Sequence, residues 1–257
     1  MDKKWWFINN KKGSHVGMII SFVVFITFVT FVFVVLKPAI NLGEGKQVSL
    51  DDTELKITQN VSANFTIASV SFADIVNPNR DCVTIQKIIT VLEFLPPYRL
   101  IIKNENSITQ ESYLFAETIP DIRINRGDQS NVFFKIYESP KFEPLGTNTG
   151  LICDTVRYIE GGTSQYKIGT VYAGQYAFES EVRKLIELYN ANYSSVKQSL
   201  KISPANEFSF SLILSNGTRL EATQSINAKN IYAQETPIQY VDADANIQAG
   251  YIVTKIW

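Results

Sequence analysis

Histidine is almost absent from this chain of 257 residues, and its scarcity excludes several kinds of chemistry. The single histidine, His15, lies at the edge of an apolar run near the start. A domain without histidine cannot hold a Ser-His-Asp or Cys-His arrangement, or a metal site built on imidazole. The motifs G-x-S-x-G, H-E-x-x-H and G-x-x-x-x-G-K-[ST] are also missing. The sequence therefore predicts no catalytic residue, no metal site and no cofactor, and we do not expect an enzyme.

A strong charge of one sign is lacking as well. The formal net charge is −1, and no basic block follows the first apolar run. Proteins that bind nucleic acids carry clustered Lys and Arg on one face, so we expect no nucleic-acid partner.

Cysteine is limited to two residues, Cys82 and Cys153. An even number of cysteines in an exported chain usually forms disulfides, whereas two buried thiols are the alternative. Nothing resembles the paired C-x-x-C spacing of a zinc site. We therefore expect Cys82 and Cys153 to be bonded to each other.

The most prominent feature that is present is an uncharged apolar run from Val16 to Leu36. A helix of that length spans about 30 Å, the thickness of the hydrocarbon core of a bilayer. A cleaved signal peptide is the alternative, but its apolar core is shorter and a small-residue cleavage site follows it. We expect an uncleaved transmembrane helix over residues 16–36. It should end at Lys37-Pro38, because proline lacks the amide donor.

The flanking charges predict the orientation of this helix. Lysines dominate the residues before the run, whereas lysines and carboxylates are mixed after it. Positive flanks stay on the cytoplasmic side. We therefore expect a cytoplasmic tail over residues 1–15 and an extracytoplasmic C-terminal domain, with the lipid bilayer as a partner.

The exported part reads as a short linker followed by a β-rich domain. Residues 37–53 are largely polar and are expected to form a stalk, and residues 54–257 the domain. Short runs rich in Val, Ile, Phe, Tyr and Thr alternate with turn residues, which is typical of an antiparallel, sandwich-like fold. The strands expected first are Leu55–Thr58, Phe65–Phe72, Thr84–Phe94, Tyr98–Ile102, Ser112–Ala116, Asn131–Tyr137 and Thr155–Ile159.

One segment has the periodicity of a helix. Phe178, Val182, Leu185 and Tyr189 begin a stripe with helical spacing that continues to Leu200. It predicts one long amphipathic helix near residues 176–201, so the fold class is α+β and mostly β. The tyrosines of the stripe could stack on a ligand, but aromatic residues at helical spacing usually belong to a core.

Two hairpins are expected after the helix. Asn216-Gly217 lies between two extended runs, which is the strongest short signal of a hairpin. A second hairpin turns at residues 242–246 and finishes at Trp257.

The turn of the second hairpin also resembles the opening of a calcium loop. Asp242, Asp244 and Asn246 place oxygen ligands at alternate positions. However, Ile247 stands where such a loop needs Gly, and Val253 where it needs a bidentate acid. These departures favour a polar turn over a metal site.

Lys11-Lys12-Gly13-Ser14, followed directly by the apolar run, resembles the class III signal of archaeal type IV pilin-like proteins. In that family a peptidase cuts after the Gly, and the apolar helix remains as the assembly element. The resemblance implies processing between Gly13 and Ser14, and self-assembly through the helix. Met18 departs from the family, which usually has Glu there. The expected helix end at Pro38 is a second departure, because the family's helix often continues as a stalk.

We therefore expect a single-pass, membrane-anchored cell-surface protein with a structural or adhesive, pilin-like role. Its expected partners are the bilayer and either further copies of itself or another surface protein. A membrane-tethered module that binds a ligand or a protein is the alternative. A surface hydrolase is a third, since glycosidase-type chemistry needs only two carboxylates.

Overall fold

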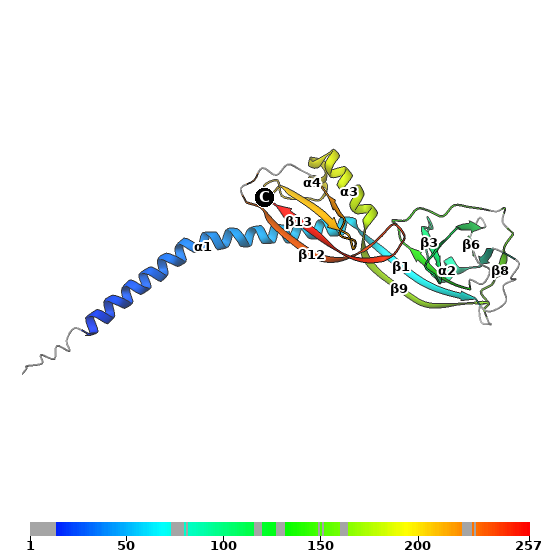
Figure 1. The fold of residues 1–257 in the computed structure, drawn as a ribbon, viewed down its shortest axis with the longest axis horizontal. Helices are drawn as coiled ribbons and strands as arrows, with labels where there is room; N and C mark the ends of the chain where they lie inside the picture. The colour runs from blue at the N-terminus through cyan, green and yellow to red at the C-terminus, as the bar shows by residue number, and fades with distance from the viewer. Residues whose placement is uncertain are drawn as a thin grey trace, which may run out of the picture.

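A long N-terminal helix leads into an elongated, mostly β body in the computed structural model of the chain (Figure 1). The structure describes residues 14–72, 80, 82–115, 120–126, 132–148, 150, 152–159, 164–222, 228 and 230–257; within the helix, the side chains of 14 and 36–44 are not described. Helix α1 spans Ser14–Val61, and strand β1 follows it directly.

The larger sheet has nine strands in the order β11-β10-β13-β12-β9-β1-β7-β3-β4. Its neighbouring strands are antiparallel, except that β12 and β9 run parallel and pair only at Tyr240–Ala177 and Val241–Phe178. The sheet is therefore nearly divided in two at this junction. Its strands are β1 Ser62–Phe72, β3 Leu100–Asn104, β4 Thr109–Gln110, β7 Phe133–Glu138, β9 Tyr166–Phe178, β10 Phe208–Ile213, β11 Arg219–Glu221, β12 Tyr232–Val241 and β13 Ile247–Ile256.

A smaller sheet lies at the end of the body far from the free part of α1 (Figure 1). Its strand order is β5-β6-β2-β8, with β2 and β8 parallel. The short helix α2 follows β2 along the chain. The bounds are β2 Cys82–Ile85, α2 Ile88–Val91, β5 Ser112–Phe115, β6 Asp121–Asn125 and β8 Asp154–Val156.

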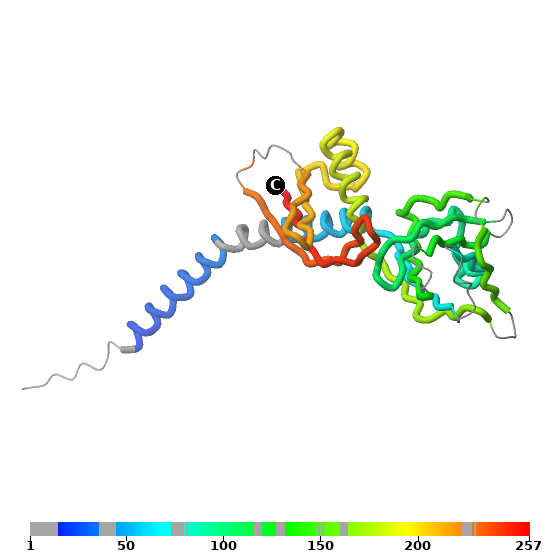
Figure 2. Tube along the Cα trace, turned by 45° about the vertical axis from the view of Figure 1, so that its right-hand side comes forward, coloured from blue at the N-terminus to red at the C-terminus, as the bar shows by residue number. Residues whose placement is uncertain are grey.

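Two lobes result, and the long strands β1 and β9 run through both (Figures 1 and 2). In the helix-side lobe, the last turns of α1 pack with α3 (Glu179–Ala191) and α4 (Tyr193–Ser199) on one face of β10, β13 and β12. In the distal lobe, the small sheet packs with α2 against β1, β7 and β3. An aromatic cluster around Phe65 and Phe178 fills the junction between the lobes.

The predicted end of the first helix at Pro38 is wrong, and so is the predicted strand Leu55–Thr58. The backbone is helical from Ser14 to Val61. Proline inside a helix removes one backbone hydrogen bond and its ring crowds the preceding turn, which costs about 3 kcal/mol or more. The following turns recover this by packing, since Leu50, Ile57 and Val61 are fully buried on one face.

The single helix expected near residues 176–201 is two helices. Residues 176–178 end strand β9, and Asn192 separates α3 from α4. Asn192 has non-helical dihedral angles, and its side chain accepts a hydrogen bond from the backbone N–H of Ser195, as a helix N-cap does. The apolar stripe nevertheless faces the core, because Val182, Leu185 and Tyr189 are all buried.

The mostly β character is confirmed, but the predicted antiparallel, sandwich-like arrangement is not. Both sheets are mixed and open. Within Thr84–Phe94 the chain leaves β2 and forms α2 instead of continuing as a strand. Both predicted hairpins are present, as β10–β11 and β12–β13, and Gly217 has the positive φ of 81° that its turn requires.

Candidate functional surface: the apolar helix and its junction with the domain

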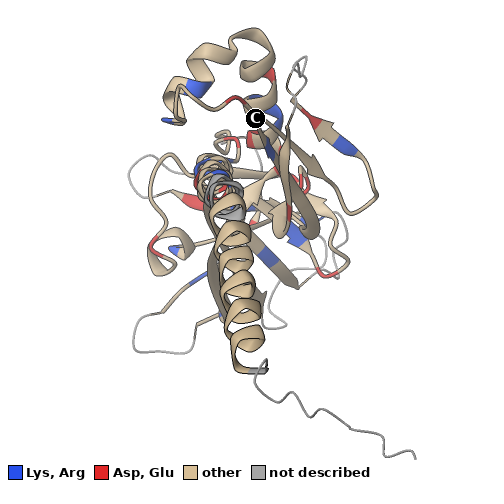
Figure 3. Cartoon of the chain, turned by 90° about the vertical axis from the view of Figure 1, so that its left-hand side faces the viewer, with Lys and Arg blue, Asp and Glu red and all other residues tan. Residues whose placement is uncertain are grey.

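The free part of α1 is the largest apolar surface that the structure describes. Residues His15–Val35 form a helical span with a mean hydropathy of 2.9, of which none is buried inside the protein. Figure 3 shows this part of the helix free of charged residues. The hydroxyls of Thr27 and Thr30 donate to the carbonyls of Val23 and Ile26, at 2.7 and 2.8 Å. These polar groups are therefore satisfied within the helix, as a lipid environment requires.

The other end of α1 belongs to the core of the helix-side lobe. Leu50, Ile57 and Val61 are fully buried among side chains of α3, α4 and the sheet. Thr53 lies on the same face and donates to the carbonyl of Ser49 at 2.8 Å. A helix with such a face cannot swing away from the sheet without exposing that face to water.

Side-chain hydrogen bonds fix the register of α1 on strand β12. Gln47 Nε2 donates to Gln234 Oε1 at 2.7 Å, and Thr236 Oγ1 donates to Glu54 Oε2 at 2.9 Å. Gln47 and Glu54 are seven residues, or two helical turns, apart, so their side chains lie on one side of α1 and face the same strand. The exposed apolar half and the buried half are parts of one continuous helix, and these bonds fix its second half on the body.

Two lysines of α1 reach the loop that follows α4. Lys46 Nζ donates to Asn206 Oδ1 at 2.7 Å. Lys56 Nζ lies 2.6 Å from Asp52 Oδ2 and donates to the carbonyl of Lys201 at 2.9 Å. The loop and the helix are therefore held together by charged donors.

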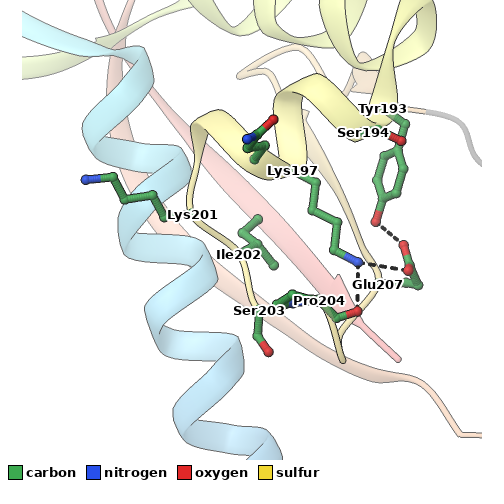
Figure 4. A pocket seen from close by; sticks show the side chains of 9 residues that line it. Tyr193, Ser194, Lys197, Lys201, Ile202, Ser203, Pro204 and Glu207 are labelled. Atoms are coloured by element: carbon green, nitrogen blue, oxygen red, sulfur yellow. Dashed lines mark hydrogen bonds and ion pairs between the residues drawn. The ribbon is translucent and has the colours of Figure 1, made fainter.

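A cavity of about 490 Å³ lies beside this loop, lined by α4, residues 201–204 and Glu207 (Figure 4). Lys197 Nζ donates to Glu207 Oε1 at 2.8 Å and to the carbonyl of Pro204 at 3.2 Å. The Tyr193 hydroxyl donates to the other oxygen of Glu207. Burial opposes ionisation of Glu207, but the hydrogen bonds from Lys197 and Tyr193 outweigh it and lower the pKa of this carboxyl. Lys197 and Glu207 are therefore paired with each other, whereas no bond of the Lys201 ammonium, which also lines the cavity, is drawn in Figure 4.

Two tyrosines of the apolar stripe hold the first residue of strand β10, Phe208, by hydrogen bonds. The Tyr189 hydroxyl donates to the carbonyl of Phe208, and the N–H of Phe208 donates to the Tyr193 hydroxyl at 3.2 Å. Burial raises the pKa of both tyrosines, so both hydroxyls stay protonated. This agrees with the interpretation of the stripe as core.

The two cysteines lie where the prediction placed them, in a disulfide between Cys82 and Cys153 with their Cα atoms 4.8 Å apart. The bond ties the start of β2 to the residue before β8. Arg80 Nε lies 3.3 Å from Asp154 Oδ1 beside it. Of the predicted processing site, Gly13 lies outside the described residues, and Ser14 is the first residue of α1.

The Asp242 turn is closed by its own hydrogen bonds. Asp242 Oδ1 accepts from the backbone N–H groups of Asp244 and Asn246 at 3.0 and 2.8 Å. Lys103 Nζ, from strand β3, donates to Asn246 Oδ1 at 2.6 Å. Burial lowers the pKa of Lys103, while Asp242 and Asp244 oppose this shift. These contacts are those of a polar turn held by a lysine. Asp242 Oδ1 is occupied by the backbone N–H groups of its own turn.

Sequence reasoning missed the C-terminal half of α1. The spacing of Leu50, Ile57 and Val61, at steps of seven and four, is the signal that could have revealed it. No family model, no curated protein and no solved structure matches the chain.

Proposed function

We propose that the protein is a single-pass, membrane-anchored cell-surface protein with a structural or adhesive role. The observation that carries the proposal is the two-part character of α1. One end is an uncharged helix of membrane length, and the other end is built into the core of a β-rich body. The bilayer would hold the first end, and the packed second end would carry the body outside the membrane.

The pilin-like part of the proposal gains from the length of α1. A helix that continues past Pro38 to Val61 removes one of the two departures from the family pattern. In an assembly built on such helices, α1 would pack against copies of itself. The departure at Met18 stays, because no carboxylate stands there to pair across an interface.

Protease treatment of intact cells tests the anchoring and its orientation. We expect added protease to degrade the body and to spare the N-terminal tail, since the lysines before the span should keep that tail in the cytoplasm. Permeabilised cells are the control, in which the tail should also become accessible. Protection of the body in intact cells would contradict the proposed orientation.

N-terminal sequencing and shearing of cells test the pilin-like part separately. Processing predicts a mature chain that begins at Ser14, and Gly13→Leu should block the cut. Recovery of the protein in sheared filaments would support assembly through α1. A chain that begins at Met1 or Asp2 and stays in the membrane would leave an anchored protein without pilin processing.

A further inference from the structure

One edge of the large sheet is open along part of β9. This strand pairs with β1 over nearly its whole length, but with β12 only at its last two residues. Hydrogen-bonding direction alternates along a strand. Phe72 of β1 donates its N–H to the carbonyl of Val132, so alternate residues of β1 face β7 and those between them face β9. The β9 partners of the latter are Tyr172, Gly174 and Tyr176, so the outward N–H and C=O groups are those of Gln175, Ala173 and Val171. A bulge opposite Ser69 ends this regular stretch.

The other strand edges that the structure describes carry features that discourage pairing. Strand β12 has Pro237, which lacks an N–H, at an outward position. Strand β5 is covered by the segment 146–148, through Leu114 N–H to the carbonyl of Gly146 and Asn148 N–H to the carbonyl of Leu114. Strands β4, β8 and β11 are two or three residues long. Short strands, prolines and covering segments are the usual protection of sheet edges.

Apart from the bulge that adjoins Val171, the open stretch of β9 has none of this protection. Its sequence from Val171 to Gln175 contains no charge and no proline. The side chains of Val171 and Tyr172 are each 51% exposed. Such an edge is a template for another strand.

The residue pattern of the stretch is complementary to itself. Antiparallel pairing about a two-fold axis at Ala173 would put Val171 opposite the partner's Gln175. The same axis would put Tyr172 opposite the partner's Gly174. Within one copy Tyr172 already leans over its own Gly174, since a Cβ built there would lie 3.3 Å from the Tyr172 hydroxyl oxygen. An aromatic side chain beside a strand glycine restores packing that the glycine lacks, and no like charges meet.

We propose that this edge of β9 binds the same edge of a second copy of the chain, antiparallel about Ala173. The joined sheets would run through both bodies. Strand β1 continues away from α1 and β9 returns beside it, along the length of the body (Figure 1). An axis perpendicular to β9 therefore places the two α1 helices at opposite ends of the pair. This step rests on the proposed anchoring: if each α1 lies in a bilayer, the contact joins copies held in two facing membranes.

Cysteine cross-linking of the full chain in detergent tests the pairing without any membrane. Directly opposed residues in such a pair have Cα atoms about 5.5 Å apart, which suits a disulfide. We expect Ala173→Cys to give a covalent dimer under mild oxidation. Glu235→Cys, an exposed position at the edge of β12, should stay monomeric. No dimer from Ala173→Cys, or equal dimer from both variants, would overturn the proposal.

Vesicles that carry the full chain test whether the pairing bridges membranes. Two differently labelled vesicle populations should cluster with the unaltered protein, and Ala173→Pro should abolish clustering. Ala173→Lys and Ala173→Glu should each fail alone and cluster when mixed, since opposite charges then face each other. Flotation of the vesicles shows separately whether the chain is anchored. Ala173→Cys cross-links confined to one population would overturn the facing-membrane arrangement.

Discussion

Thr236 donates a hydrogen bond to Glu54 across 182 residues of sequence, at 2.9 Å. The bond joins the strand β12 to the second half of α1, far from the apolar span. It lies beside the buried residues that make α1 part of the core. The second half of α1 is therefore held in place by contacts inside the body.

The buried half of α1 should carry much of the stability of the helix-side lobe. Ile57 is 0% exposed, and Ile57→Ala should lower the free energy of unfolding by about 2–5 kcal/mol through lost burial and a cavity. Leu55 is 55% exposed on the opposite side of the helix. Leu55→Ala should change the free energy of unfolding by no more than about 0.5 kcal/mol. Urea unfolding followed by near-ultraviolet circular dichroism measures both. Similar losses would show that the face is not packed.

The disulfide should stabilise mainly the distal lobe. Its cysteines are 71 residues apart, and closing a loop of that size contributes about 4 kcal/mol in the chain-entropy model. Replacing both cysteines with serine should therefore destabilise the protein and raise amide hydrogen exchange in β2 and β8. Exchange in α3 is the internal control and should change little. Free thiols found by mass spectrometry in the natural protein would contradict the bond.

Glu207 should make stability depend on pH in the acid range. Its pKa is lowered in the folded state, so its contribution is present above the unfolded value of about 4.3 and is lost as pH falls through the folded value. The side chain is 43% exposed, so Glu207→Gln should cost no more than about 1 kcal/mol at pH 7. The difference in the free energy of unfolding between the two proteins should shrink as pH falls below about 4.3.

Replacing two of the glycines with alanine should change the stability of the protein in opposite directions. A Cβ on Gly250 would lie 2.5 Å from the carbonyl oxygen of Ile213, so Gly250→Ala should destabilise by about 1–3 kcal/mol. Gly45 lies inside α1 with no described atom within 4 Å of that position, so Gly45→Ala should stabilise by about 0.5–1 kcal/mol. Thermal unfolding of both variants measures the difference. A tolerated Gly250→Ala would mean that β10 and β13 can separate there.

The sequence by itself determined the features that depend on composition and local pattern. The uncharged run, the β-rich character, the Asn216-Gly217 turn and the apolar stripe around Leu185 were all readable, because each reflects a local preference or a strong period. The pairing of Cys82 with Cys153 was also predictable, since only one pairing of two cysteines exists.

Tertiary structure alone decided how these parts are joined. The helix past Pro38 exists because a sheet formed by the last residues of the chain covers Leu50, Ile57 and Val61. Their spacing has little meaning until that sheet is present. Residues 176–178 became the end of a strand because β1 and β12 offered partners for them, and long-range pairing outweighs local helical preference. The open edge of β9 is likewise a property of strand order, which no local pattern in the sequence encodes.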